Sequence, residues 1–146
     1  MNDFSIFEYL YRDAGNYKNW CSVLLVGCAT PVDTEIVKAS LDRGEFFVAE
    51  QIGLPAAHLK ADGAMHVPTE DDHVWHEFSE LRPAEADDIV GTPWGTVAEL
   101  VARFGSVQRW DQRLSPHWDL TAELRASLAQ NFLDRNGSWK DMAFLR

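Results

Sequence analysis

The sequence predicts one α+β domain, in which a small mixed β-sheet of three or four strands packs against about three helices. The chain has 146 residues, of which 46% are hydrophobic, and this length and composition are typical of a single self-sufficient core. Stretches with alternating apolar residues, as in strands, are interspersed with stretches that repeat apolar residues every three or four positions, as in helices. We therefore expect residues 1–146 to form one domain.

Three strands are expected in the amino-terminal third. Residues 4–11 alternate between two faces, and residues 20–26 are almost continuously apolar, as in a strand covered on both sides. Turn-forming residues at 13–16 join them, so the two strands should form an N-terminal hairpin. After a helix, residues 45–52 alternate again and predict a third strand.

Three helices are expected. Thr30 followed by proline is a favourable helix start, and apolar residues continue at helical spacing to Leu41. The same threonine-proline pair at Thr92 predicts a second helix that ends at Gly105. Apolar residues at every fourth position over residues 120–132 predict the third.

Residues 73–81 fit two structures. As a helix they would place four large apolar residues on one side. These are Val74, Trp75, Phe78 and Leu81. However, histidine, valine, tryptophan and phenylalanine are mediocre helix formers, and Pro83 limits a helix here to about three turns. We favour a strand.

Negative charge is concentrated in residues 70–88. The chain has a net charge of −10, and these nineteen residues contain eight acidic residues and one arginine. Such a segment repels phosphate groups, which argues against direct nucleic-acid binding, and it attracts a basic protein surface. We therefore predict a small acidic protein of bacterial type that acts by stoichiometric protein binding, as an accessory, immunity or inhibitor protein.

The residues expected to contact the partner come from the acidic segment and from the hairpin loop, where aromatic and polar groups are typical of recognition surfaces. They are Glu70, Asp71, Asp72, Glu85, Asp87 and Asp88, with Tyr11, Arg12, Tyr17 and Lys18. Six tryptophans are many for this length and suggest a further hypothesis, a homodimer with tryptophans at its interface.

The alternative is a metal-dependent enzyme, a hydrolase that holds zinc or iron with imidazole and carboxylate ligands. The candidate ligands are His73, His76, Glu77, His117 and Asp119. A helix would bring the first three onto one face, whereas a strand would point His76 away from the other two. The spacing matches no established zinc motif, so the favoured hypothesis includes no cofactor and no identified catalytic residue.

No apolar run approaches the ~20 residues that cross a bilayer, and the first residues lack the pattern of a signal peptide. We expect a cytoplasmic protein that does not enter the membrane. Cys21 and Cys28 flank an apolar strand, so we expect both to be buried thiols without a disulfide.

Overall fold

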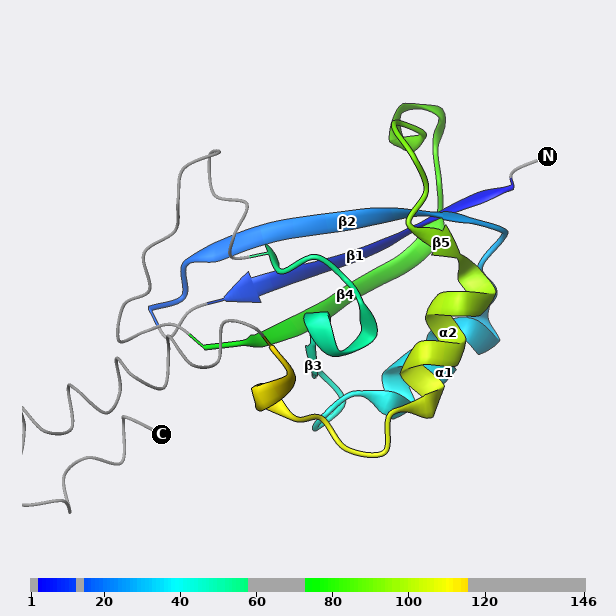
Figure 1. The fold of residues 1–146 in the computed structure, drawn as a ribbon. Helices are drawn as coiled ribbons and strands as arrows, with labels where there is room; N and C mark the ends of the chain where they lie inside the picture. The colour runs from blue at the N-terminus through cyan, green and yellow to red at the C-terminus, as the bar shows by residue number, and fades with distance from the viewer. Residues whose placement is uncertain (1–2, 13–14, 58–72, 116–146) are drawn as a thin grey trace, which may run out of the picture.

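In the computed structural model, which describes residues 3–12, 15–57 and 73–115, one mixed sheet has the strand order β3-β4-β1-β2-β5 (Figure 1). Its strands are β1 (Phe4–Arg12), β2 (Lys18–Val26), β3 (Phe46–Val48), β4 (Trp75–Pro83) and β5 (Gly95–Thr96). The helices of these residues are α1 (Pro31–Ser40) and α2 (Val97–Ser106), with the short 3-10 helices η1 (Ala49–Ile52), η4 (Ala86–Asp88) and η5 (Gln112–Leu114). The α+β class is confirmed.

β1 is the central strand. It pairs antiparallel with β2 in an unbroken register from Phe4 opposite Val26 to Arg12 opposite Lys18, which confirms the N-terminal hairpin. On its other side β1 pairs antiparallel with β4, and β4 pairs antiparallel with β3. The short β5 adds the one parallel pairing of the described sheet, along the end of β2.

One face of the sheet, here the inner face, is covered by α1 and α2, which lie side by side on it (Figure 1). The ring of Phe7 lies at the centre of this layer. Its centroid is 5.5 to 6.0 Å from the rings of Tyr9, Phe47, Phe78 and Phe104, which belong to β1, β3, β4 and α2. Since Phe7 is fully buried, this aromatic cluster joins three strands and a helix into one core.

A β-bulge in β4 sets which side chains reach that core. Glu8 faces Glu80, but the next residue of β1, Tyr9, faces Phe78, so Ser79 is the extra residue. Phe78 and Leu81 therefore both point to the inner face although they are three positions apart. The strand expected here is confirmed.

One of the two expected helix starts is confirmed, and the other is shifted along the chain. Thr30 caps α1 through a capping box with Asp33, as expected. α2 begins later than expected, at Val97, with Thr96 as its cap. The residues before it belong to the sheet instead, because the Trp94 N–H donates to the Leu24 carbonyl (2.8 Å) and extends the chain alongside β2.

Two expectations about the strands need correction. The described sheet has five strands instead of three or four. The strand expected over residues 45–52 covers only Phe46–Val48, since the chain tightens into η1 and then turns at Gly53, whose φ is 80°. Of the three expected helices, two lie in the described residues as α1 and α2, and the helix expected at 120–132 falls outside them.

Phe7→Ala should destabilise the fold by about 3–5 kcal/mol, because it removes a ring packed on four others and leaves a cavity. Chemical denaturation followed by tryptophan fluorescence measures the change. Val32→Ala on α1 is the matched control, since this side chain is 62% exposed and its loss should change stability by about 0.5 kcal/mol or less. Equal effects of the two substitutions would contradict the central role of Phe7.

Candidate functional site

The face of the sheet opposite α1 and α2, here the outer face, is covered by no helix of the described residues. It carries the alternate side chains of the three long strands. From β1 these are Ile6, Glu8, Leu10 and Arg12, opposite Leu24, Ser22, Trp20 and Lys18 of β2 and next to Glu77, Glu80 and Arg82 of β4. At one end Ile6 and Leu24 form a small apolar cluster with Ala84. The rest of the face contains charged side chains, the exposed Trp20 and Ser22, and the buried Leu10.

Two carboxylates face each other at the middle of the outer face. Glu8 and Glu80 are directly opposite in the register of β1 and β4. Like charges in this position destabilise a sheet. Relief is partial, because the Ser79 hydroxyl donates to Glu8 (3.3 Å) and Arg82 Nε lies 4.0 Å from Glu80. Glu8 was not identified from the sequence, because its partner lies far along the chain.

A third carboxylate, Glu77, is paired with an arginine at the hairpin end of the outer face. Arg12 Nε donates to Glu77 (2.9 Å), and Arg12 Nη1 donates to the side-chain oxygen of Asn16 (2.8 Å). The Arg12 side chain remains 40% exposed, which leaves guanidinium N–H groups at the surface. The pair ties the hairpin turn to β4 while keeping both charges within reach of a partner.

The acidic turn η4 adjoins the other end of β4. Arg82 Nη1 donates to Asp88 (2.7 Å), and the Glu85 N–H donates to the same carboxylate (2.8 Å). The bond from Arg82, followed by that from Glu85, lowers the pKa of the Asp88 carboxyl below its ordinary value. Around this pair lies a hollow of about 450 Å³, which Glu85 also lines. Glu85 and the neighbouring Asp87 are exposed.

Aromatic side chains accompany these charges. Trp20 is 56% exposed on β2, opposite Leu10, and Tyr17 is 73% exposed beside the hairpin turn. Trp75, opposite Val48 at the other side of the sheet, is half-buried. Exposed tryptophan and tyrosine are the side chains that contribute most to protein interfaces.

Most of the expected partner contacts that the structure describes are at the surface. Arg12, Tyr17 and Lys18 surround the hairpin end, and Glu85, Asp87 and Asp88 lie together at η4. Tyr11 is a correction. It lies on the inner face at 2% exposure, where its hydroxyl accepts from the His73 N–H (3.2 Å), so its side chain supports the fold instead of facing a partner. Glu70, Asp71 and Asp72 fall outside the described residues.

Of the three candidate metal-binding imidazoles, the two that the structure describes, His73 and His76, are bonded to the backbone. His76 is fully buried, and its Nε2 accepts from the Ala57 N–H (2.9 Å), which requires Nδ1 to carry the proton that it directs at the Val74 carbonyl (3.2 Å). His73 has the opposite tautomer. Its Nδ1 accepts from the Trp75 N–H (3.0 Å), and its Nε2 donates to the Arg12 carbonyl (2.7 Å).

The proposed metal ligands do not converge in the described part of the chain. His76 points to the inner face and Glu77 to the outer face, as the strand alternative required. Among the described residues no three histidine, cysteine, aspartate or glutamate side chains lie close enough to hold an ion. His117 and Asp119 fall outside these residues.

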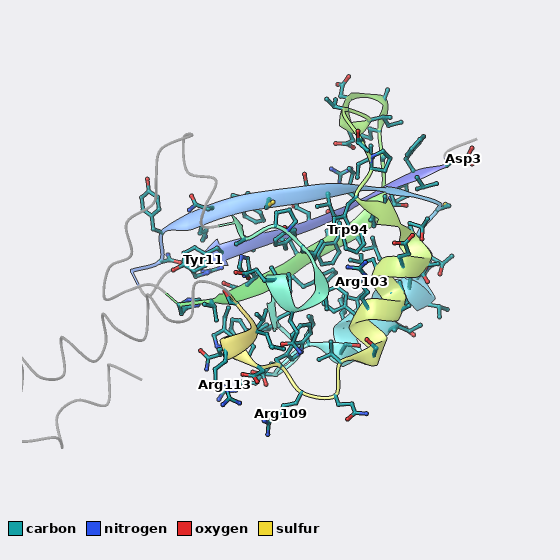
Figure 2. All side chains as sticks on the ribbon, in the orientation of Figure 1. Asp3, Tyr11, Trp94, Arg103, Arg109 and Arg113 are labelled. Atoms are coloured by element: carbon teal, nitrogen blue, oxygen red, sulfur yellow. The ribbon has the colours of Figure 1, made fainter. Side chains whose placement is uncertain are left out.

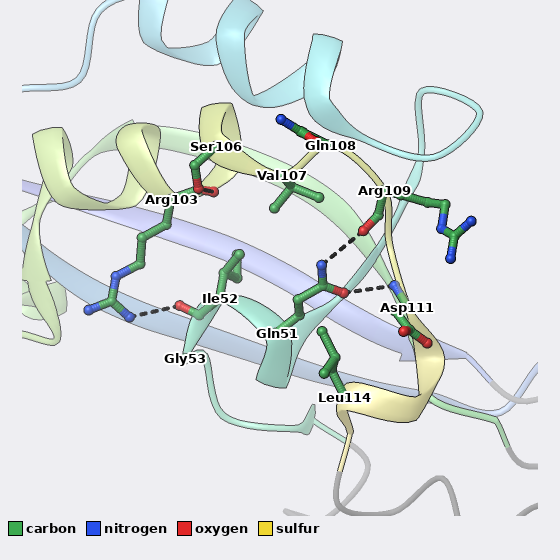
Figure 3. Close-up of a pocket in the computed structure, with 10 residues that line it drawn as sticks. All are labelled: Gln51, Ile52, Gly53, Arg103, Ser106, Val107, Gln108, Arg109, Asp111 and Leu114. Atoms are coloured by element: carbon green, nitrogen blue, oxygen red, sulfur yellow. Dashed lines mark hydrogen bonds between the residues drawn. The ribbon is translucent and has the colours of Figure 1, made fainter.

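A groove of about 650 Å³ lies between η1 and the segment that follows α2 (Figure 3). Gln51 occupies its centre, where it donates to the Arg109 carbonyl (3.0 Å) and accepts from the Asp111 N–H (2.8 Å). Arg103 is held at one end by the Ile52 carbonyl (3.0 Å), and Arg109 points away at the other. Gln51 thus holds the segment after α2 in place. Because the two guanidinium groups point in different directions, they do not face a common ligand site.

Three arginines lie on the helical side of the molecule, away from the acidic turn (Figure 2). Arg103 belongs to α2, Arg113 to η5 and Arg109 to the segment between them.

Of the two cysteines, Cys21 is buried as expected, but Cys28 is exposed beyond the end of β2, and neither forms a disulfide. The expectation of two buried thiols is therefore half wrong.

Comparisons with protein-family models, with curated proteins and with solved structures find no match to this chain. The helices that the structure describes include none with the length and apolar character needed to span a bilayer. The chemistry of the outer face is therefore the main guide to function.

The Asp88 carboxyl should titrate below the ordinary aspartate pKa of about 3.9, because the Arg82 bond favours its charged form. Its contribution to stability is present above that value and is lost as the pH falls through the lowered pKa. Carbon-detected NMR titration measures the midpoint. Arg82→Met should move the Asp88 midpoint upwards and leave that of Asp111, which is lowered by Arg113, unchanged. Equal movement of both carboxyls would contradict the assignment.

His76 should be a neutral imidazole with the proton on Nδ1, because its Nε2 accepts a backbone hydrogen bond. Long-range ¹⁵N–¹H correlation distinguishes the tautomers, with His73 as the internal control of opposite type. Addition of one equivalent of zinc should leave both patterns unchanged. A zinc-dependent shift of the His76 signals would instead revive the metal-dependent enzyme.

Proposed function

We propose that this protein acts by stoichiometric binding of another protein, as a small accessory, immunity or inhibitor protein, and that its outer face contacts a basic surface of that partner. The proposal combines the acidic turn η4 with the carboxylates of β1 and β4. These are six carboxylates, and against Arg12, Lys18 and Arg82 of the outer face they leave a net charge of −3, which can steer and select a positively charged partner.

The observation that carries the proposal is the Glu8–Glu80 pair. Like charges directly opposite each other on a sheet destabilise the fold, so this pair makes no stabilising contribution of its own. A cation of a partner placed between the two carboxylates would remove that repulsion. The arrangement therefore disfavours the isolated protein and favours a complex.

Trp20 and Tyr17 supply the apolar part of the same surface. An interface needs a few large side chains that lose water on binding, with charges around them that set orientation. Trp20 lies one row of side chains from Glu8 on the outer face, and Lys18 and Arg12 give the hairpin end a local positive charge. The partner surface should accordingly be mainly basic, with an acidic edge facing the hairpin.

A cytoplasmic location belongs to this proposal. It is supported by two cysteines that form no disulfide, one of which is exposed, since a free thiol at the surface is typical of reducing compartments.

The double variant Glu8→Gln, Glu80→Gln should weaken binding of the partner captured from the native host by about tenfold at low ionic strength. Glu35→Gln with Asp42→Asn is the matched control, because it removes two negative charges from exposed positions on the helical side. Isothermal titration calorimetry with the purified partner measures both. The difference should shrink as salt is added. Equal weakening by the two pairs, or binding insensitive to salt, would refute the acidic-face proposal.

A further inference from the structure

The long edge of β2 has no neighbouring strand in the described structure. β5 pairs with Leu25 and Val26 alone, and the Leu24 carbonyl accepts from Trp94. The remaining edge runs from Lys18 to Val23. An open edge of this length presents a row of backbone N–H and C=O groups ready to pair with another strand.

The direction of these groups follows from the bond at Leu24. Its carbonyl points away from β1, because Trp94 lies on that side. Since the register with β1 is unbroken, every second residue of β2 has its backbone groups pointing the same way. Lys18, Trp20 and Ser22 therefore offer their N–H and C=O groups outwards.

The edge is also suited to meet a copy of itself. β1 contains Glu8, and β4 contains Glu77 and Glu80, whereas β2 contains no carboxylate and one lysine. Two molecules of net charge −10 can thus approach most closely along this strand. The exposed Trp20 lies at the middle of the open stretch.

We propose that two copies of this protein associate through β2, antiparallel, about a two-fold axis at Trp20, so that their sheets become continuous. In this register Trp20 faces Trp20 of the second copy, and Lys18 faces Ser22, which engages all three outward residues. An axis at Lys18 would oppose two lysines, and one at Ser22 would place Trp20 opposite Leu24, whose carbonyl is already bonded. The two-fold axis at Trp20 avoids both conflicts.

The contact is small, because it consists of a short ladder and one pair of tryptophans. Such an interface is typical of weak, concentration-dependent association. The dimer shares Trp20 and Lys18 with the partner surface proposed above, so the second copy and the partner compete for these two side chains. The acidic residues of the outer face lie on β1, β4 and η4 and remain uncovered by the pairing of β2 edges.

The register predicts opposite effects for two substitutions at one exposed position. Ser22→Glu places a carboxylate opposite Lys18 of the second copy, twice per dimer, and should tighten association by about tenfold. Ser22→Lys opposes two ammonium groups and should weaken it by a similar factor. Overall net charge predicts the reverse order, because Ser22→Lys makes the protein less negative. Sedimentation equilibrium over a range of protein concentrations measures all three proteins.

The stability of each folded chain separates this effect from misfolding. Ser22 faces Glu8 within its own sheet, so Ser22→Lys should stabilise the monomer and Ser22→Glu should destabilise it. Association and stability therefore change in opposite directions.

Trp20→Ala should abolish dimerisation, whereas Val32→Ala, an equally exposed apolar change on α1, should not affect it. A wild-type protein that stays monomeric at the highest concentration, or tighter association of Ser22→Lys than of Ser22→Glu, would overturn the proposal.

Discussion

The packing of Phe7 against the rings of β3, β4 and α2 is the contact on which the rest of the structure depends. It fixes which face of β1 is buried, and alternation along the strand then leaves no choice for its neighbours. Because Phe7 and Tyr9 point inwards, Glu8 must point outwards, opposite Glu80. The charged outer face is thus a consequence of the aromatic core, and the two cannot be altered independently.

Local sequence rules were sufficient where a single segment determines its own structure. The hairpin of β1 and β2 follows from alternation and turn residues, and α1 follows from Thr30 and its capping box. The local rules failed at the start of α2, because two threonines resemble a helix start there. These are Thr92 with its proline and Thr96 with Glu99. The choice is made by the Leu24 carbonyl of another strand, which draws Trp94 into the sheet.

The site was harder to predict than the fold, because its defining contacts join distant residues. Phe78 and Leu81, three positions apart, have helical spacing, and only the bulge at Ser79 reconciles that spacing with a strand. The pairing of Glu8 with Glu80 requires the register of β1 and β4. Tyr11 and Arg12 were grouped as neighbours in a loop, but as successive strand residues they lie on opposite faces. The metal hypothesis for the histidines assumed side chains available to an ion, whereas the described backbone occupies both rings.

The bond from the Ala57 N–H to His76 has a consequence for how this protein can diversify. It holds Ala57 against β4, and the bond from His73 to the Arg12 carbonyl holds the residues before β4 against β1. Two positions nineteen residues apart in the sequence are therefore fixed against each other by one imidazole. Doubling the number of residues between two such positions costs only about 0.6 kcal/mol of chain entropy. The bond can therefore form over a connection of a different length, while the sheet and its outer face stay as they are.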